Sequence, residues 1–136
     1  MLAKILSFGL NGITGYPVQI EIDVNAGLPS YDVVGLADTA IKESKARVRA
    51  AIKNSTYSYP INKIIINLAP ADTKKEGSMY DLPIALGILV AQDLFSNNLL
   101  KDIVVDLYKF LPKACNNQYF FEYVLVFEFL NYQIVK

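Results

Sequence analysis

The chain has 136 residues, of which 53% are hydrophobic and 19% charged, so it is long enough for one domain with a packed core. Thirteen Lys and Arg residues balance thirteen Asp and Glu residues, which gives a formal net charge of zero. No global field therefore steers the protein to nucleic acid or to an anionic membrane, and any polyanion must be bound by a local cluster of charges.

Two of the residue types that enzymes use most are scarce. The sequence has no histidine and a single cysteine, Cys115. This excludes Ser-His and Cys-His nucleophilic pairs, an internal disulfide and the common zinc sites, and we expect no metal site. The lone thiol fits a reducing compartment, and neither a signal peptide nor a stretch of membrane-spanning length is found. We therefore expect a cytoplasmic protein with no membrane partner.

Two strands and a turn are predicted early in the chain. Strict alternation over residues 18–24 predicts a half-buried strand with one wet side. Its apolar face is formed by Val18, Ile20, Ile22 and Val24. Residues 25–30 are typical of a turn, and residues 31–35 predict a short second strand.

A helix with a basic stripe is predicted next. Asp38 or Thr39 can cap it, because either side-chain oxygen can accept a hydrogen bond from a first-turn amide. The apolar stripe contains Ile41, Val48 and Ile52. Beside the apolar stripe, four basic residues recur at helical spacing: Lys42, Lys45, Arg49 and Lys53. Arg47 lies off to one side of this basic stripe.

The next elements complete an α/β pattern. The β-branched run at residues 63–69 predicts a central strand, and residues 70–80 form a polar loop too long for a simple hairpin. Asp81 is expected to cap a second helix over about residues 82–94, which is apolar nearly all round and therefore central. We predict a mixed α/β fold, an α+β arrangement of two layers with about four strands and two packed helices.

The loop before this helix offers two kinds of chemistry. Free amides at a helix N-terminus and nearby lysines attract anions, which makes a candidate anion-binding loop of Lys74, Lys75, Gly77 and Ser78. The pattern G-x-x-x-x-G-K-[ST] occurs nowhere in the chain, so nucleotide hydrolysis is not expected, and a solvated connection explains the loop more simply. Ser78 is also a candidate nucleophile, which without histidine would need Lys74 or Lys75 as its base.

The basic stripe has two interpretations. Lys42, Lys45, Arg49 and Lys53 could neutralise a few phosphates and bind DNA or RNA in a salt-dependent way. Charge runs on amphipathic helices are more often an ordinary solvated face. Because Glu43 is the only acid nearby, the pattern favours a polyanion or an acidic neighbouring domain.

Several blocks of sequence together resemble one family. These blocks are residues 27–40, 42–44, 47–55, 66–72, 75–78 and 81–89, and they occur in family order within residues 1–105. They resemble the opening of the bacterial ComM/YifB-type magnesium-chelatase-like AAA+ proteins. The resemblance implies an N-terminal domain similar in fold to the proteolytic domain of Lon and the C-terminal domain of RadA. It also implies a link to DNA processing and to competence, with an AAA+ ATPase module following this domain in complete members.

The resemblance also bears on catalysis and partners. Relative to Lon, Met79 aligns with the nucleophile and Ser78 with the place before it, and the partner lysine lies in a part that this chain replaces. We therefore expect no catalytic residues, with a degenerate Lon-like serine hydrolase using Ser78 as the alternative. ATP and Mg²⁺ are expected only in the absent AAA+ module, and the expected partners are DNA, that module or other subunits.

The sequence changes character beyond residue 105. Residues 106–136 replace the expected family continuation by an aromatic-rich tail. We expect residues 1–105 to form an incomplete magnesium-chelatase-like domain, truncated relative to its family. A frameshift and a divergent short protein are both compatible with the tail, and a chain with no function of its own is a third interpretation.

Overall fold

A mixed four-stranded sheet forms one layer of the molecule. The computed structural model describes residues 2–94, so the predicted tail lies outside the described residues. The strands are β1 (Leu2–Asn11), β2 (Thr14–Asn25), β3 (Ser30–Val34) and β4 (Lys63–Ala69). Their order across the sheet is β1-β2-β4-β3, with β3 parallel to β4 and the other neighbours antiparallel. The predicted mixed sheet and the central position of residues 63–69 are confirmed.

Strand β1 is the element that we did not predict. It pairs with β2 along its whole length through a hairpin whose two loop residues are Gly12 and Ile13. Gly12 has φ of +62°, a conformation that suits glycine in such tight turns. Residues 18–24, the predicted strand, form only the second part of the longer β2.

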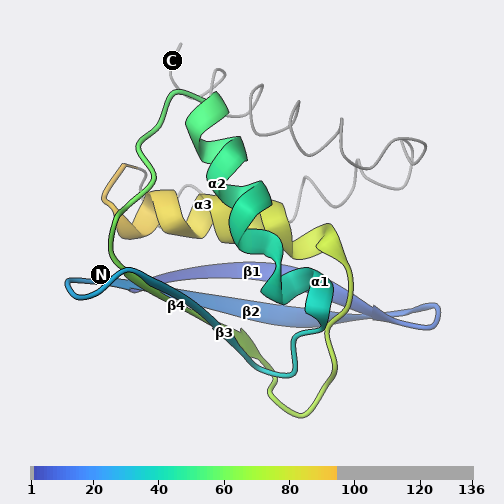
Figure 1. Cartoon of the computed structure of the whole chain (residues 1–136). Helices are drawn as coiled ribbons and strands as arrows, with labels where there is room; N and C mark the ends of the chain where they lie inside the picture. Colours follow the sequence, from blue (N-terminus) through green and yellow to red (C-terminus); the bar gives the residue numbers. More distant parts are fainter. Residues whose placement is uncertain (1, 95–136) are drawn as a thin grey trace.

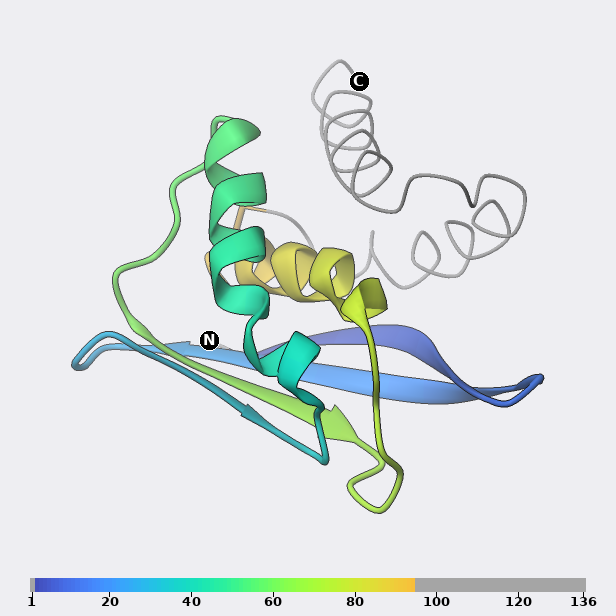
Figure 2. The same cartoon turned by 45° about the vertical axis from the view of Figure 1, so that its right-hand side comes forward.

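The helices form a second layer on one face of this sheet (Figures 1 and 2). They are α1 (Thr39–Lys42), α2 (Ser44–Asn54) and α3 (Asp81–Ala91), with the short 3-10 helix η1 (Ser78–Tyr80) leading into α3. Helix α3 packs on β1 and β2, and α2 packs on α3. The fold is therefore the predicted α/β arrangement of two layers.

The core lies between α3 and the sheet. Every residue from Pro83 to Ala91 is buried, which confirms the prediction of a central helix. Gly87 allows α3 to approach the sheet, since a Cβ atom there would lie 2.1 Å from Cδ1 of Ile22. Ile20, Ile22 and Ile66 supply fully buried side chains from the sheet. Burying an aliphatic side chain of this size contributes about 1.5–3 kcal/mol, so this interface stabilises the fold.

Two details of the helices differ from the sequence-based prediction. The single helix expected after Asp38 is two helices, because the chain turns at Glu43 between α1 and α2. Asp38, not Thr39, caps α1. The expected capping role of Asp81 is wrong: Asp81 lies inside the first turn of α3, which has no side-chain cap, and its carboxylate pairs with Arg47.

Candidate functional site

The basic face consists of Lys42, Lys45, Arg49 and Lys53, all of them exposed. Lys42 ends α1, whereas the other three lie on α2 at helical spacing. The opposite side of α2 is buried through Ser44, Val48 and Ile52. Within residues 2–94, no ion pair involves a member of the basic face. Among the described residues, these charges are therefore not neutralised by a carboxylate.

Among residues 2–94, Arg49 is the one member of the basic face that lies against an aromatic ring. Its guanidinium carbon lies 5.8 Å from the centre of the Tyr59 ring. Cation-π attraction at an exposed site contributes about 0.5–1 kcal/mol. The ring of Tyr59 is half-buried, and burial raises the pKa of its hydroxyl, so the ring is a neutral platform. The Tyr59 ring therefore gives the Arg49 side chain a contact with the rest of the domain.

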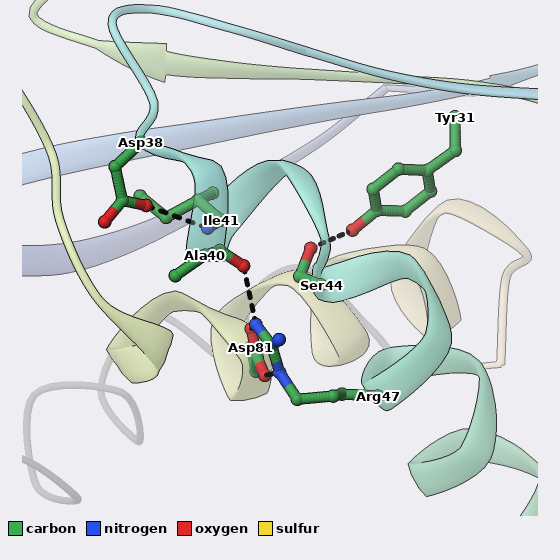
Figure 3. Close-up of polar contacts among 7 residues, drawn as sticks. All are labelled: Tyr31, Asp38, Ala40, Ile41, Ser44, Arg47 and Asp81. Carbon is green, nitrogen blue, oxygen red and sulfur yellow. Dashed lines mark hydrogen bonds and ion pairs between the residues drawn. The ribbon is translucent and has the colours of Figure 1, made fainter.

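Arg47 does not belong to the basic face. Two nitrogens of its guanidinium donate hydrogen bonds to the Asp81 carboxylate, Nε to Oδ2 and Nη2 to Oδ1, the latter at 3.1 Å (Figure 3). Nη2 also donates to the Ala40 carbonyl at 2.7 Å. Burial raises the pKa of Asp81, and the hydrogen bond and charge of Arg47 oppose that rise. One side chain of α2 thereby ties α1 and α3 together.

A second polar contact in the same region joins the sheet to α2. The Tyr31 hydroxyl of β3 and the Ser44 hydroxyl of α2 are 2.6 Å apart (Figure 3). Burial raises the pKa of Tyr31 strongly, which keeps its hydroxyl protonated and able to donate. The first turn of α2 is therefore fixed to β3, as well as to α3.

The loop before η1 is bound to the segment that follows β3. The Asp38 amide donates to the Lys75 carbonyl at 3.1 Å, and the Lys75 amide donates to the Leu36 carbonyl at 3.1 Å. The Asp38 carboxylate accepts from the Ile41 amide at 2.8 Å and from the Gly77 amide at 2.9 Å. One carboxylate thus caps α1 and also holds the far end of the loop.

Gly35 allows the segment after β3 to approach the backbone of β4 closely. A Cβ atom at Gly35 would lie 2.1 Å from the Leu68 carbonyl oxygen, and Gly35 has φ of +99°, which side-chain-bearing residues rarely adopt. The glycine therefore lets the segment after β3 lie directly against β4.

Lys75 is enclosed by these two segments. Its side chain is fully buried, and Nζ donates to the Gly35 carbonyl at 3.0 Å and to the Pro70 carbonyl. Burial lowers the pKa of Lys75. The ammonium group that the sequence suggested for an outside anion is already bound to two carbonyl oxygens of the protein itself.

The remaining residues of the candidate anion loop have partners of their own or are half-buried. Lys74 is exposed and pairs with Glu76 at 2.7 Å, and this partner raises the pKa of Lys74. The Gly77 amide is taken by Asp38, and Ser78 begins η1, where it is half-buried. The structure brings these residues into one loop, but their charges and donors are largely engaged within the protein.

Metal and membrane features are absent from the part of the chain that is described. Residues 2–94 contain no group of three or more Asp, Glu, Cys or His side chains placed to hold a metal ion. Within the same range, no helix has the length and apolar character required to cross a membrane.

Comparison with known proteins places the chain in a family. The family model described as subunit ChlI of Mg-chelatase matches residues 20–105. The chain belongs to this family. It is 48% identical over 91 residues to the uncharacterized protein YifB of Escherichia coli, covering 67% of this chain and 18% of that protein. It is 43% identical over 100 residues to the competence protein ComM of Haemophilus influenzae, covering 74% of this chain and 20% of that protein.

A third relative shows the same extent of similarity. The protein YifB of Salmonella typhimurium is 51% identical over 89 residues, covering 65% of this chain and 18% of that protein. The chain therefore spans about a fifth of the length of the curated relatives that it matches. The resemblance to ComM and YifB that the sequence blocks suggested is confirmed.

The sequence blocks that resemble the family contain the polar residues that join separate elements of the fold by hydrogen bonds and an ion pair. Gly35, Asp38, Lys75 and Gly77 meet where the segment after β3 touches the loop before η1, and Arg47 and Asp81 meet between α2 and α3. The sequence analysis did not predict these contacts. The single available signal was that Arg47 lies off the basic stripe, next to the apolar one.

Proposed function

We propose that this chain acts as a non-catalytic accessory domain of a magnesium-chelatase-like protein and contacts DNA through its basic face. The observation that carries the proposal is the set of four exposed cations with no ion-pair partner among residues 2–94. The name of the relative ComM refers to competence, and the family resemblance points to DNA processing. Both features support DNA as the polyanion.

The spacing of the cations suits a phosphate backbone. Lys45 and Lys53 are eight residues apart on α2, which corresponds to about 12 Å along a helix axis. One strand of duplex DNA presents about three or four phosphates over that distance. Lysine ammonium groups bind phosphate as point charges and read no base, so we expect contact with the backbone without sequence specificity.

On this proposal, ATP binds to another module and not to the described residues. The described residues offer no cluster of metal ligands, and the sequence lacks the phosphate-binding loop pattern, so they do not fit Mg²⁺-ATP. We propose that ATP and Mg²⁺ act in the AAA+ module of full-length relatives, in the cytoplasm, with that module or other subunits as further partners. This domain would then contribute affinity for DNA next to the AAA+ module.

Charge removal tests the proposal directly. The variant with Lys42, Lys45, Arg49 and Lys53 all changed to Gln is compared with wild type for binding to a fluorescent 20-base-pair duplex across a salt series. Four phosphate contacts correspond to a slope of about −3.6 in log K against log salt, and the variant should lose most of this slope. A control changes Lys4 and Lys63, two exposed lysines that belong neither to the basic face nor to the candidate anion-binding loop, to Gln.

Two outcomes decide the matter. Loss of slope in the basic-face variant with retention in the control supports the proposal, provided that circular dichroism shows both variants folded. Equal affinity and slope in wild type and the basic-face variant would remove it.

The competing function is a degenerate serine hydrolase using Ser78. Burial lowers the pKa of Lys75, which is the direction that a lysine base requires, and Lys75 lies three residues before Ser78. However, the Lys75 ammonium donates to the carbonyls of Gly35 and Pro70. Labelling by a fluorophosphonate that Ser78→Ala abolishes would favour the hydrolase, and absence of labelling would leave the DNA-binding function.

A further inference from the structure

Arg49 differs from the lysines of the basic face in the chemistry of its charged group. It lies on α2 between Lys45 and Lys53, four residues from each, so these three side chains follow one side of the helix. A guanidinium presents its N–H donors as a planar fork that can bind two oxygens of one phosphate group, whereas an ammonium binds as a point charge. Arg49 is therefore the residue of the basic face that can hold a phosphate group in a defined orientation.

The donors of this fork are not used within the described part of the chain. Arg49 is exposed, and among residues 2–94 neither a hydrogen bond nor an ion pair engages its guanidinium. Arg47, two positions earlier on the same helix, is the contrast, because its guanidinium donates to the Asp81 carboxylate and to the Ala40 carbonyl. Within the described residues, Arg47 thus joins elements of the fold, whereas the donors of Arg49 have no acceptor.

Tyr59 supplies a fixed surface beside Arg49. The Arg49 guanidinium carbon lies 5.8 Å from the centre of the Tyr59 ring. The Tyr59 side chain packs against the hydrophobic core, and its hydroxyl oxygen is buried without a hydrogen-bond partner among residues 2–94. Pro60 follows Tyr59 and restricts its backbone to extended conformations. The ring is therefore held by contacts other than the one with Arg49.

Contact with an aromatic ring is compatible with phosphate binding by the same guanidinium. The ring attracts the cation through its π face, whereas the guanidinium donates its hydrogen bonds in its own plane. Arg49 can therefore contact Tyr59 and a phosphate group at the same time. A side chain that is already restrained also loses less rotamer entropy when it binds, and this loss otherwise weakens binding.

We propose that Tyr59 is a positioning residue for DNA binding, whose ring holds the Arg49 guanidinium so that two of its nitrogens donate to one phosphate group of the backbone. This inference rests on the proposed function, since it describes how the basic face binds DNA. Arg49 then makes the strongest single phosphate contact of the basic face, although each of the four cations contributes equally to the dependence on salt. Tyr59 acts only through Arg49 and does not itself touch DNA.

Conservative replacement of Arg49 tests the fork separately from the charge. Arg49→Lys keeps the charge, and therefore the slope of log K against log salt, but loses the second hydrogen bond to the phosphate group. We expect affinity for the 20-base-pair duplex to fall about three- to ten-fold, the size expected for loss of one hydrogen bond, with an unchanged slope. Lys53→Gln is the matched comparison, because it removes a charge and should reduce the slope by about 0.9.

A double-mutant cycle tests whether Tyr59 acts through Arg49. Tyr59→Leu should weaken duplex binding about two- to five-fold, the size expected for loss of an exposed cation-π contact, and should leave the salt slope unchanged because no charge is removed. The same change in an Arg49→Gln background should have no effect, whereas in a Lys53→Gln background it should weaken binding by the full factor. A merely structural role of Tyr59 would weaken binding equally in all three backgrounds.

Tyr59→Phe separates the ring from the hydroxyl. It keeps the ring beside Arg49 and removes a buried hydroxyl that has no partner among the described residues. This variant should therefore restore the affinity that Tyr59→Leu loses, and it should not lower the urea midpoint. Urea unfolding of every variant shows whether the binding data refer to folded protein. Tyr59→Met, whose flexible side chain adapts to the same space, takes the place of Tyr59→Leu in the cycle if the latter is unfolded.

The outcomes separate this inference from the proposed function. If changing Lys42, Lys45 and Lys53 to Gln weakens duplex binding but Tyr59→Leu does not, the basic face binds DNA and the positioning role of Tyr59 is wrong. An equal effect of Tyr59→Leu with Arg49 and with Arg49→Gln would also overturn that role. Unchanged affinity in Arg49→Lys would overturn the contact through two nitrogens. If no change to the basic face alters binding, the proposed function fails and this inference fails with it.

Discussion

The Asp38 carboxylate offers the clearest test of how the two loops are joined. It accepts two hydrogen bonds from different segments, one from the Ile41 amide at 2.8 Å and one from the Gly77 amide at 2.9 Å. Asp38→Ala removes both bonds, while Asp38→Asn keeps one acceptor oxygen and turns an NH2 donor toward one of the two amides. The two variants therefore separate the helix cap from the bond between the loops.

The expected magnitudes follow from these contacts. Loss of a helix cap costs about 1 kcal/mol, and loss of a hydrogen bond to a charged group costs about 1.5–3 kcal/mol. We expect Asp38→Ala to lower the free energy of unfolding by about 2.5–4 kcal/mol. Asp38→Asn should lower it by about 1.5–3 kcal/mol, because asparagine is a good cap and only the contact with Gly77 is lost.

Urea unfolding followed by circular dichroism measures both values. Asp32→Ala is the matched control, since Asp32 is an exposed carboxylate whose neighbour is Ser30, and it should change stability by less than about 0.5 kcal/mol. Native-state hydrogen exchange should show faster exchange of the Gly77 amide in both Asp38 variants. Equal losses of stability in Asp38→Ala and Asp38→Asn, or an unchanged Gly77 amide, would refute the idea of two separate bonds.

Two further predictions concern ionised groups. Asp81→Ala should cost about 3–5 kcal/mol because it leaves the Arg47 guanidinium, only 28% exposed, without its carboxylate, whereas the double variant Arg47→Met with Asp81→Leu should recover much of that loss in urea unfolding. A double variant no more stable than Asp81→Ala would contradict this. Hydrogen bonds from Asn67, Lys4 and Gln19 lower the pKa of Glu21 below 4.5, so its contribution is present above that pH and is lost as pH falls through the lowered value. Stability measured from pH 6 downward should therefore decline less in Glu21→Gln than in wild type, and parallel curves would argue against it.

Periodicity was sufficient where one face of an element is polar and the other apolar. This condition holds for β2 beyond Pro17, whereas β4 was predicted from its β-branched run, since Ile65 and Ala69 lie on its less buried face. It fails for β1, where small residues such as Ser7 and Gly9 face the core while leucines lie on the open face. Without the usual polar and apolar alternation, β1 carries no strand signal, although it fixes half of the hairpin.

The polar residues show a different limit of sequence reasoning. Asp81 stands where a capping residue is expected, but its carboxylate is satisfied by Arg47, which is 34 positions earlier in the chain. Lys75 belongs to a residue type that is almost never fully buried, yet two carbonyl oxygens enclose its ammonium. Sequence rules for capping and anion binding consider only residues that are close in the chain. The partners of Asp81 and Lys75 are distant in the chain, and they determine whether each charge is paired within the protein.

The contacts made by Asp38 and Arg47 also affect how the residues of the basic face are arranged. Lys42 lies on α1, separated from Lys45 by the turn at Glu43, so helical spacing alone does not align the two. Their relative position depends on the Asp38 cap of α1 and on the bond from Arg47 to the Ala40 carbonyl. If the basic face binds DNA as proposed, the ion pair of Arg47 with Asp81 and the Asp38 cap therefore help to position the charges that would contact phosphate. On the proposed function, substitutions at Asp38 or Arg47 would alter DNA binding through the orientation of α1, without removing any charge of the basic face.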